Sequence, residues 1–419
     1  MIKYLLLMLF TVSVNAYSQD LQKINAKAKF KDFCFSDKIA TVKLFKTGNP
    51  LADPIITLNS GETVTLIFDE FIDDNNDVMG NYCYTIEHRD ADWREEGLII
   101  NDYMSGFSEN EFEIIRHSQG TAVMYRNFFL TLPNSSVNLK ISGNYLIKVF
   151  ERRTQQLVLI KGFSVIEPLT AVNASMQPPT NRLCTQQLNF TVEHPTLKIP
   201  DVYMNLKVRI EQNSIRVPNS KDPLPAFVKP GSIDYTRPDK NTYGGQNEFR
   251  SFDTRALNYS GQGIAGRTNG DIQKVDLVHD MEHSEYVPIS DINGKYIIAS
   301  DRAVNPDIQS DYIKVGFSFA SKSHLEGRVF LFGELTNWSI SEKYEMRYIN
   351  RSYKCEALLK QGFYNYQYIV VNHKGDLDIS ATEGCFYDTE NTYNIYVYFR
   401  APENRYDKLV GFQRVISKR

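Results

Sequence analysis

The sequence lacks the residue patterns that metal, redox or nucleic-acid chemistry requires. Only five of its 419 residues are cysteine, and no two of them form the Cys-x-x-Cys pair that holds zinc or exchanges disulfides. The 47 basic residues are outnumbered by 50 acidic ones, so no excess of positive charge points to nucleic acid. After residue 18, no apolar run approaches the roughly 18 residues of a membrane-spanning helix. The sequence therefore indicates no zinc or redox centre, no nucleic-acid partner and no helical membrane span.

The few cysteines are widely scattered, at Cys34, Cys83, Cys184, Cys355 and Cys385. An odd count of five allows at most two disulfides within the chain. Cys355 and Cys385 could be neighbours across one sheet, whereas the large spacings favour buried free thiols. The sequence leaves both alternatives open.

The first 18 residues have the three parts of a secretory signal. One early cation, Lys3, precedes an apolar run from Tyr4 to Val14, and Ala16-Tyr17-Ser18 supplies small residues where a signal peptidase reads the chain. The sequence predicts a cleaved signal over residues 1–18, with a buried first strand or helix as the alternative. No cysteine follows the predicted cleavage site, so we expect no lipid anchor. Cleavage removes one charged side chain and leaves 46 of the 47 basic residues against 50 acidic ones.

Strand patterns dominate the first part of the mature chain. The sequence contains 25 Tyr and 25 Phe, which favour the half-buried surface of a pleated strand. Polar turns separate short segments that are alternating or densely apolar, at residues 40–45, 63–68, 82–88, 125–132, 145–151 and 158–165. Such strands need a two-layer antiparallel core. Because proline cannot donate to a strand ladder, Glu167-Pro168 ends the last strand, and we expect a β-sandwich over residues 19–168.

A middle β-rich domain with long loops is expected over residues 169–320. Its clearest strands lie at residues 187–192 and 202–212. Five prolines then keep residues 217–240 irregular. Further on, Phe249 and Phe252 can enter a core while charged neighbours such as Arg250 pair at its rim. Ion pairing at an interface is the alternative for these charged residues.

Residues 321–419 are expected to form a C-terminal sandwich. Tyr364, Tyr366 and Tyr368 fall on one face of a strand, because strand side chains alternate with period two. The run Gly-x-x-x-x-Trp that ends at Trp338, followed by Gly-x-Tyr-x-Tyr, resembles the early-set immunoglobulin-like modules, including the glycogen-binding type. The sequence as a whole therefore predicts an all-β fold of tandem immunoglobulin-like antiparallel β-sandwich domains.

No set of side chains predicts catalysis, cofactor binding or metal binding. The segment Glu87-His-Arg-Asp-Ala-Asp92 contains acids and a histidine, but a strand edge that runs into a turn carries such residues as capping and solvated groups. His279-Asp-Met-Glu-His283 has the two-histidine spacing of a zinc-protease helix. Its surroundings, however, predict extended backbone, on which that spacing does not bring the two rings together. We therefore assign no catalytic, cofactor-binding or metal-ligating residue, and expect that the chain is not an enzyme.

Five stretches spread along the chain form a recognisable set. They are Tyr84-Thr-Ile-Glu-His-Arg-Asp-Ala-Asp-Trp93, Ser142-Gly-Asn-Tyr-Leu-Ile-Lys-Val-Phe150, Asn247-Glu-Phe-Arg-Ser-Phe-Asp-Thr-Arg255, Lys360-Gln-Gly-Phe-Tyr-Asn-Tyr366 and Arg405-Tyr-Asp-Lys-Leu-Val-Gly411. In this order they resemble the plug-protein family of the type IX secretion system of Bacteroidota. The resemblance implies a periplasmic β-sandwich protein that caps the periplasmic mouth of a large outer-membrane translocon barrel when no cargo is engaged. It implies no catalytic residues.

Two classes of function follow. The resemblance implies a non-enzymatic periplasmic plug, peripherally associated with the outer membrane, whose partner is the translocon barrel. For such a plug, aromatic anchors in the Gly- and Pro-rich loops of residues 217–270 are the expected contact region. The alternative is a secreted glycan-binding protein that uses the C-terminal module, with Trp338 as a stacking platform. We expect Trp338 to fill the sandwich or its rim instead.

Overall fold

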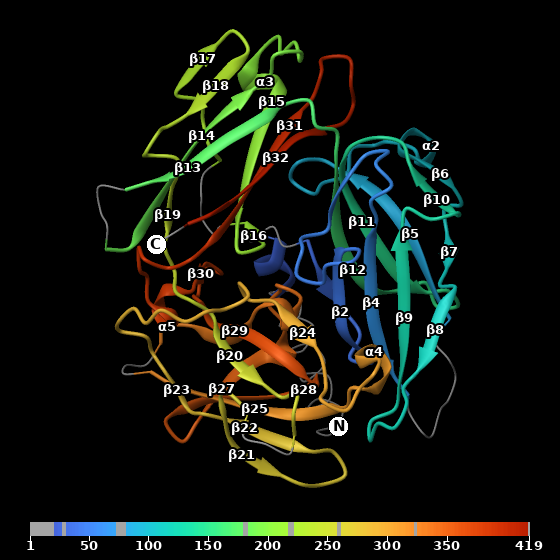
Figure 1. Cartoon of the computed structure of the whole chain (residues 1–419), viewed down its shortest axis with the longest axis vertical. Coiled ribbons are helices and arrows are strands. Elements are labelled where there is room, and N and C mark those ends of the chain that lie inside the picture. The colour runs from blue at the N-terminus through green and yellow to red at the C-terminus, as the bar shows by residue number, and fades with distance from the viewer. Residues whose placement is uncertain are drawn as a thin grey trace, which may run out of the picture.

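The computed structural model describes residues 21–26, 31–72, 81–178, 183–216, 222–257, 261–321 and 325–417. The predicted signal over residues 1–18 lies outside these residues. Strands build three lobes that meet at the centre of the molecule (Figure 1), and the predicted all-β class is confirmed. Within the described ranges, no helix is both long enough and apolar enough to cross a membrane.

The first lobe, domain 1, is a sandwich of two sheets. One sheet has the order β1-β12-β11-β5-β7, with β3 beside β12, and the other has the order β2-β4-β9-β8. The strands are β1 (Phe33–Cys34), β2 (Ile39–Lys46), β3 (Ile55–Thr57), β4 (Val64–Phe71), β5 (Tyr82–Arg89), β7 (Asn110–Glu111), β8 (Ile114–His117), β9 (Tyr125–Leu132), β11 (Gly143–Glu151) and β12 (Gln156–Ile166). At one end lie α2 (Ile100–Tyr103), β6 (Met104–Gly106) and β10 (Val137–Leu139). Alternate residues Val64, Leu66 and Phe68 of β4 enter the core between the sheets, as the period of two requires.

The second lobe, domain 2, is assembled from two distant parts of the chain. One sheet has the order β13-β14-β18-β17, with β19 beside β14, and the other has the order β16-β15-β31-β32. The elements are β13 (Ala171–Gln177), β14 (Thr185–Glu193), α3 (Val202–Asn205), β15 (Leu206–Gln212), β16 (Ile215–Arg216), β17 (Phe227–Lys229), β18 (Ser232–Tyr235), β19 (Thr242–Gly244), β31 (Thr392–Phe399) and β32 (Lys408–Ile416). Every side chain of β31 is buried, because the strand lies between β15 and β32 within the sandwich.

The third lobe, domain 3, contains the largest sheet, in the order β20-β29-β26-β27-β28-β25-β22-β21 with β23, β24 and β30 at its sides. Its strands are β20 (Arg250–Asp253), β21 (Ile264–Thr268), β22 (Lys274–Leu277), β23 (Asp280–Met281), β24 (Tyr296–Ile298), β25 (Tyr312–Ala320), β26 (Arg328–Phe332), β27 (Glu345–Ile349), β28 (Ser352–Lys360), β29 (Gly362–Val371) and β30 (Leu377–Asp378). Short helices α4 (Pro306–Gln309), α5 (Ser380–Glu383), η1 (Glu334–Thr336) and η2 (Glu342–Tyr344) connect them. Tyr364, Tyr366 and Tyr368 of β29 share one core cluster, as predicted.

The sheets divide the chain differently from the predicted domain boundaries. The expected boundary between residues 320 and 321 falls inside domain 3, because β20 and β25 belong to the same sheet as β26 to β29. Residues 392–416, expected in the C-terminal sandwich, belong instead to domain 2, where β31 pairs with β15 and β32 pairs with β31. Domain 3 is therefore inserted into domain 2. Between domains 1 and 2, β12 ends at Ile166 and β13 begins at Ala171.

The two connections between domains 2 and 3 run side by side and are cross-linked. Gln246 on the outgoing connection accepts the N–H of Phe386 on the returning one at 2.8 Å. A disulfide joins Cys184, next to β14, to Cys385. The considered pairing of Cys355 with Cys385 is therefore wrong, because Cys355 faces a different part of the fold. Cys34, Cys83 and Cys355 carry free thiols, and Cys83 is fully buried.

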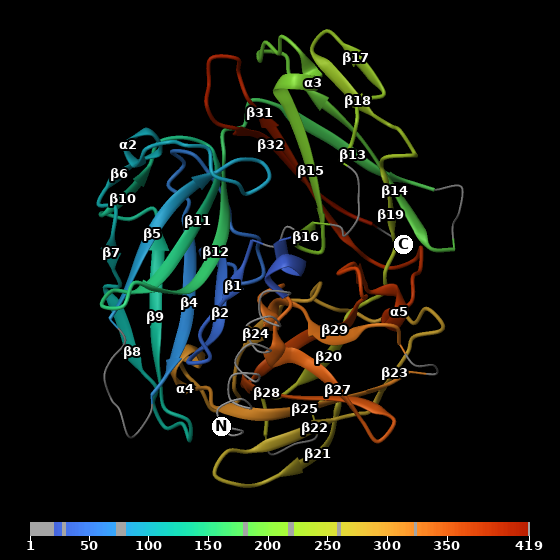
Figure 2. The same cartoon turned by 180° about the vertical axis from the view of Figure 1, so that it is seen from behind.

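A short helix at residues 21–26 lies where the three lobes meet, drawn in dark blue in Figures 1 and 2. Leu21 and Ile24 of this helix pack in one cluster with Trp338. The Asn25 side chain exchanges two 2.9 Å hydrogen bonds with the main chain of Ile340. Trp338 is only 6% exposed and packs edge-on against Phe332. Its predicted place inside the sandwich or its rim is confirmed, and no sugar can stack on its ring in this conformation.

Candidate functional site

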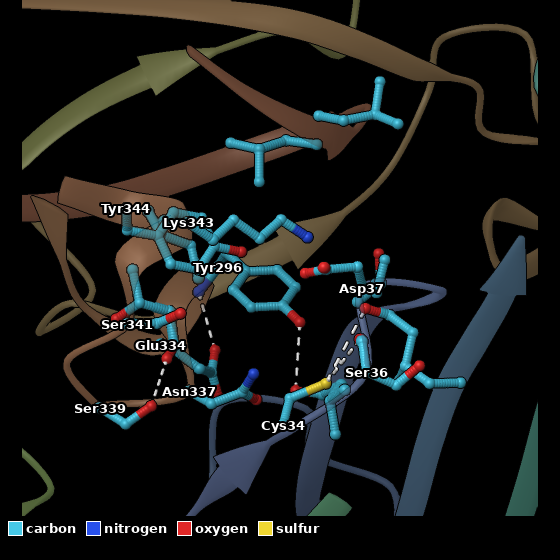
Figure 3. A pocket seen from close by; sticks show the side chains of 18 of the residues that line it. Cys34, Ser36, Asp37, Tyr296, Glu334, Asn337, Ser339, Ser341, Lys343 and Tyr344 are labelled. Carbon is cyan, nitrogen blue, oxygen red and sulfur yellow. Dashed lines mark hydrogen bonds between the residues drawn. The ribbon is translucent and has the colours of Figure 1, made fainter. Parts of the chain in front are cut away.

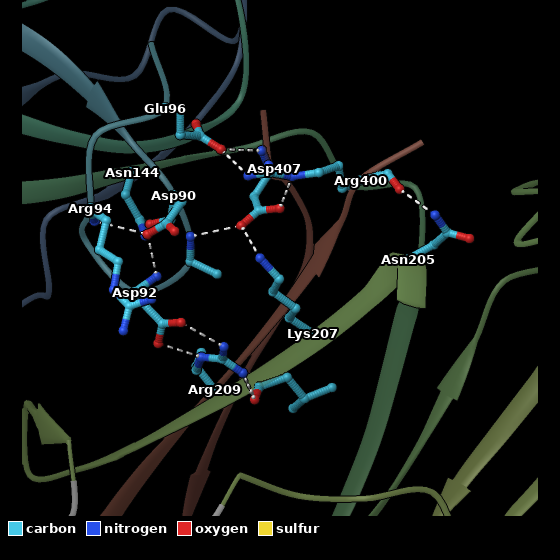
Figure 4. A network of polar contacts seen from close by, with 12 residues as sticks. Asp90, Asp92, Arg94, Glu96, Asn144, Asn205, Lys207, Arg209, Arg400 and Asp407 are labelled. Carbon is cyan, nitrogen blue, oxygen red and sulfur yellow. Dashed lines mark hydrogen bonds and ion pairs between the residues drawn. The ribbon is translucent and has the colours of Figure 1, made fainter. Parts of the chain in front are cut away.

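The turn after β5 connects domain 1 to domain 2 (Figure 4). The carboxylate of Asp90 accepts the N–H groups of Asp92 and Arg94, both at 2.8 Å, so it caps the turn as predicted. This turn directs Asp92 toward β15, where Arg209 donates two hydrogen bonds of 3.1 and 3.0 Å. Arg216 adds a third at 2.7 Å. Burial alone would raise the pKa of Asp92, but the hydrogen bonds from both arginines hold it well below its usual range.

A second cluster surrounds Asp407, on the connection between β31 and β32 (Figure 4). Its carboxylate accepts hydrogen bonds from Arg400 at 2.6 Å, Lys207 at 2.8 Å and the N–H of Ala91 at 3.0 Å. Its own N–H donates to Glu96 of domain 1 at 2.9 Å. Burial would raise the pKa of Asp407, yet Arg400 and Lys207 hold it below its usual value. This cluster fixes the two domains to each other at both ends of the turn.

The residues from Glu87 to Asp92 were expected to be capping or solvated groups, but not all of them are solvated. Glu87 is half-exposed and pairs with Lys148 at 2.7 Å, in agreement with that prediction. His88 is 5% exposed, and its Nδ1 lies 2.8 Å from a Glu96 oxygen. Side chains alternate along β5, so His88 faces the sandwich interior while Glu87 faces water. The segment is a joint between domains and not a surface turn.

Domains 1 and 3 are held together by a buried ion pair. Asp69 of β4 and Lys360 of β28 lie 2.7 Å apart, and their side chains are 0% and 1% exposed. Tyr312 donates to the same carboxylate at 2.6 Å and Asn127 at 2.8 Å. Burial lowers the pKa of Lys360 and raises that of Asp69, while each charge opposes the effect on the other. Three donors thus replace the water that this carboxylate loses.

Asp53 is the residue at which all three domains meet. It lies on the connection between β2 and β3 of domain 1, and Lys295 of domain 3 donates to it at 2.7 Å. Asn394 of domain 2 donates to its other oxygen at 2.7 Å, and Arg414 lies 3.6 Å away. Burial would raise the pKa of Asp53, but Lys295 and Arg414 hold it well below its usual range. One side chain therefore ties the three lobes to each other.

A cavity of about 130 Å³ lies between domains 1 and 3 (Figure 3). Its lining is mostly polar and includes Cys34, Ser36 and Lys343. Burial raises the pKa of the Cys34 thiol, which therefore stays protonated and is a poor nucleophile. The Ser339 hydroxyl donates to the main chain of Thr336 at 3.0 Å and is not paired with a base. A polar cavity of this size has room for a few water molecules.

Arg250 lies deep in domain 3, although the sequence placed it at a rim. Only 7% of it is exposed. Its guanidinium binds Glu383 at 3.1 and 3.0 Å and Asp280 at 2.9 Å. The hydroxyls of Tyr366 and Tyr368 also donate to Asp280, at 2.8 and 2.7 Å. This network is internal to the domain and stabilises the sheet that faces α5.

The two histidines at positions 279 and 283 do not form a site. The segment between them is the strand β23, so the predicted extended backbone is confirmed. The His279 ring contacts the Ser318 hydroxyl at 2.9 Å, whereas the His283 ring contacts the Asn247 amide at 2.8 Å. In the part of the chain that the structure describes, no group of three or more His, Cys, Asp or Glu side chains is arranged to hold a metal ion.

The polar side chains that stand out in this structure hold domains together. Asp92, Asp407 and Asp69 each bind a partner from another domain. Sequence reasoning missed these joints because the partners are far apart along the chain: 117 residues separate Asp92 from Arg209, and 291 separate Asp69 from Lys360. The only local signal was the dense run of charges after β5.

The comparisons with known proteins find a matching family model and a closely similar solved structure. A family model described as "Type 9 secretion system plug protein 1st domain" matches residues 39–167, which form domain 1. A crystal structure of a hypothetical protein from Parabacteroides merdae is similar over 93% of this chain and 99% of its own, with 30% sequence identity and a TM-score of 0.87. No curated protein matches the chain. The family model ends at residue 167, at the end of domain 1, so the early-set likeness of the C-terminal segment stays a prediction.

Two other solved structures align far more weakly. A biofilm-associated protein domain gives 6% identity and a TM-score of 0.17, covering 92% of this chain and 60% of its own. The N-terminal domains of the outer capsid protein Hoc of bacteriophage RB49 give 12% identity and a TM-score of 0.14, covering 89% of this chain and 97% of that one. Scores this low carry no argument about fold or function.

Proposed function

Since this chain belongs to the type IX secretion system plug family and so has a role in type IX secretion, we propose that it is a periplasmic plug. In this proposal it is not an enzyme. It binds the periplasmic opening of the outer-membrane translocon barrel and seals that opening when no cargo is engaged.

The observation that best supports the proposal is the way the three domains are locked together. Asp53 binds partners in domains 2 and 3 at once, Asp92 and Asp407 join domains 1 and 2, and the buried Asp69 pair joins domains 1 and 3. Interfaces between domains are otherwise places where relative motion is expected. A plug must bind and dissociate without its domains moving relative to one another, and these contacts between domains provide that rigidity.

The same contacts support a role without catalysis. The carboxylates of Asp92, Asp407 and Asp69 all bind cationic side chains, so they are engaged in structure and unsuited to take up a proton from a substrate. The Cys34 thiol in the cavity between domains 1 and 3 has a raised pKa. The buried Trp338 gives no support to the glycan-binding alternative.

The proposed location is the periplasm, with peripheral attachment to the outer membrane through the translocon. Washing membranes with concentrated salt should release the protein if its contacts with the translocon are mostly polar, because salt screens charges. The control is a strain without the translocon gene, in which the protein should appear in the soluble periplasmic fraction. Recovery from that strain only with detergent would contradict the proposed attachment.

The decisive experiment is deletion of the gene followed by measurement of antibiotic entry. We expect a large antibiotic that the outer membrane normally excludes to enter the deletion strain. A second deletion, of the translocon gene, should restore exclusion because the open channel is then missing. If the single deletion leaves permeability unchanged while the translocon is present and lacks cargo, the proposed sealing function is wrong.

A further inference from the structure

Four large apolar side chains stand exposed at the end of domain 2, at the top of Figure 1. Tyr203 and Met204 of α3 are 69% and 76% exposed, and Phe227 and Val228 of β17 are 64% and 49% exposed. We call these four residues the apolar tip. Strand β17 is the last strand of its sheet, so no other strand among those described covers its outer edge. The edge is short and ends in Lys229, which discourages pairing with another strand, so the exposed side chains and not the backbone edge are the feature of interest.

The backbone under the apolar tip is firmly held. The Asp201 carboxylate caps α3 by accepting the N–H groups of Tyr203 and Met204 at 2.8 and 3.2 Å. At the other end of α3, the Asn205 amide donates to the carbonyl of Arg400 at 2.9 Å, which ties the helix to the end of β31. The exposed side chains are therefore presented by a fixed scaffold, which lowers the entropy lost when a partner binds.

The two halves of the apolar tip are adjacent. Phe227 of β17 pairs with Asp234 of β18, the neighbour of Tyr235. In Figures 1 and 2, α3 and the β17–β18 hairpin lie at the same end of domain 2. The loop that leads to α3 starts after β14, and its first residue, His194, donates its N–H to the carbonyl of Gly231 in the β17–β18 turn at 2.8 Å. The four side chains therefore project from two elements at one end of domain 2.

The charges around the apolar tip are balanced. Residues 194–205 and 222–240 together contain four acidic and four basic side chains. Asp201 is used as the helix cap, and Asp239 pairs with Arg237 at 3.1 Å. A membrane surface rich in anionic lipid is recognised by clusters of unpaired basic residues, which this end of the molecule does not supply. Its complement is an uncharged apolar protein surface with a polar rim.

We propose that the apolar tip is the surface that docks on the translocon, against an apolar protein surface at the periplasmic opening of the barrel. This inference rests on the proposed function and adds where the contact lies. The tip projects at one end of the longest axis of the molecule, away from domain 3, so it can enter an opening before the bulk of the protein meets the rim (Figure 1). Exposed aromatic and methionine side chains are the types that dominate such interfaces. Part of the tip, Phe227 and Val228, falls in the loop region expected from the sequence.

The test uses the full-length protein with Tyr203→Asp and Phe227→Asp combined. Purified wild-type and variant proteins are titrated against detergent-solubilised translocon isolated from the deletion strain. We expect binding at least about tenfold weaker for the double variant, because charged groups replace two central apolar anchors. Phe107→Asp is the matched control, since Phe107 is a 74% exposed phenylalanine of domain 1. It should bind like the wild type, and so should Phe227→Leu, which keeps the apolar surface.

The outcomes separate this inference from the proposed function. All the variants should melt like the wild type, because the substituted side chains make few contacts; a variant that melts earlier is replaced by Met204→Asp with the same expectation. Wild-type affinity in the double variant would overturn the docking surface while leaving sealing intact. If the wild type but not the double variant binds vesicles of phosphatidylethanolamine and phosphatidylglycerol, the apolar tip is a lipid-binding surface and the proposed docking on the translocon is wrong. If only the wild type forms dimers and the double variant binds the translocon with wild-type affinity, the apolar tip binds a second copy of this chain and the proposed docking surface is wrong. A wild-type chain that fails to bind the translocon would refute the proposed function as well.

Discussion

Replacing Lys360 by methionine removes one charge from the joint between domains 1 and 3 and keeps most of the side-chain volume. Asp69 then loses its partner at 2.7 Å in a site where its side chain is 0% exposed. The remaining donors, Tyr312 at 2.6 Å and Asn127 at 2.8 Å, are neutral. Breaking a buried pair in this way leaves a charge uncompensated, and we expect the free energy of unfolding to fall by about 3 to 5 kcal/mol.

The assay is urea-induced unfolding followed by tryptophan fluorescence, because Trp93 lies in domain 1 and Trp338 in domain 3. Lys274→Met is the matched control: its pair with Glu356 is 37% and 45% exposed, so the loss should stay below about 1 kcal/mol. Adding Asp69→Leu to Lys360→Met removes the stranded charge and should recover much of the lost stability. If Lys360→Met costs no more than the control, solvent screens the pair and the argument for a locked joint is wrong.

Three further perturbations test the structure. Trp338→Ala should cost about 3 to 5 kcal/mol through the cavity it leaves, seen as a lower melting temperature; glycan binding that disappears without a change in melting would instead support the glycan-binding alternative. Replacing Cys184 and Cys385 by alanine should lower the free energy of unfolding by about 2 to 5 kcal/mol. A reductant should lower the melting temperature of the wild type but not of this variant. An equal response of the two proteins would show that the disulfide does not stabilise the fold. The depressed pKa values of Asp92 and Asp407 contribute stability that is present above the unfolded-state value of about 3.9 and is lost as the pH falls toward the lower folded values. The urea midpoint should therefore drop on acidification below about pH 4 and drop less in Asp92→Asn, whereas identical pH profiles for the two proteins would contradict the assigned role of this carboxylate.

Local patterns in the sequence were sufficient where a residue's environment depends on its neighbours along the chain. The alternation of Tyr364, Tyr366 and Tyr368 placed all three in one core, and the cap formed by Asp90 follows from a strand that runs into a turn. The buried position of Trp338 also agreed with the expectation, since a large aromatic side chain gains most by leaving water.

Long-range pairing could not be predicted in the same way. The strand β31 has the composition of any buried strand, and nothing in its own residues selects β15 over a strand of domain 3 as its neighbour. The carboxylate of Asp92 looks the same in sequence whether water or Arg209 satisfies it. Arg250 was placed at a rim because lone arginines are seldom buried, and the two acids that make burial tolerable lie 30 and 133 residues away.

The insertion of domain 3 into domain 2 dictates an order of folding. A chain that is delivered from its N-terminus supplies β13 to β19 early, but β15 lacks β31 until the last strands arrive. Domain 3 can therefore fold while domain 2 still lacks β31 and β32. The apolar face of the incomplete sandwich is then exposed, and such a state is prone to aggregation. Cys184 must likewise keep its thiol until Cys385 emerges 201 residues later. Domain 2, and with it the scaffold under the apolar tip, can be completed only after β31 and β32 have been delivered.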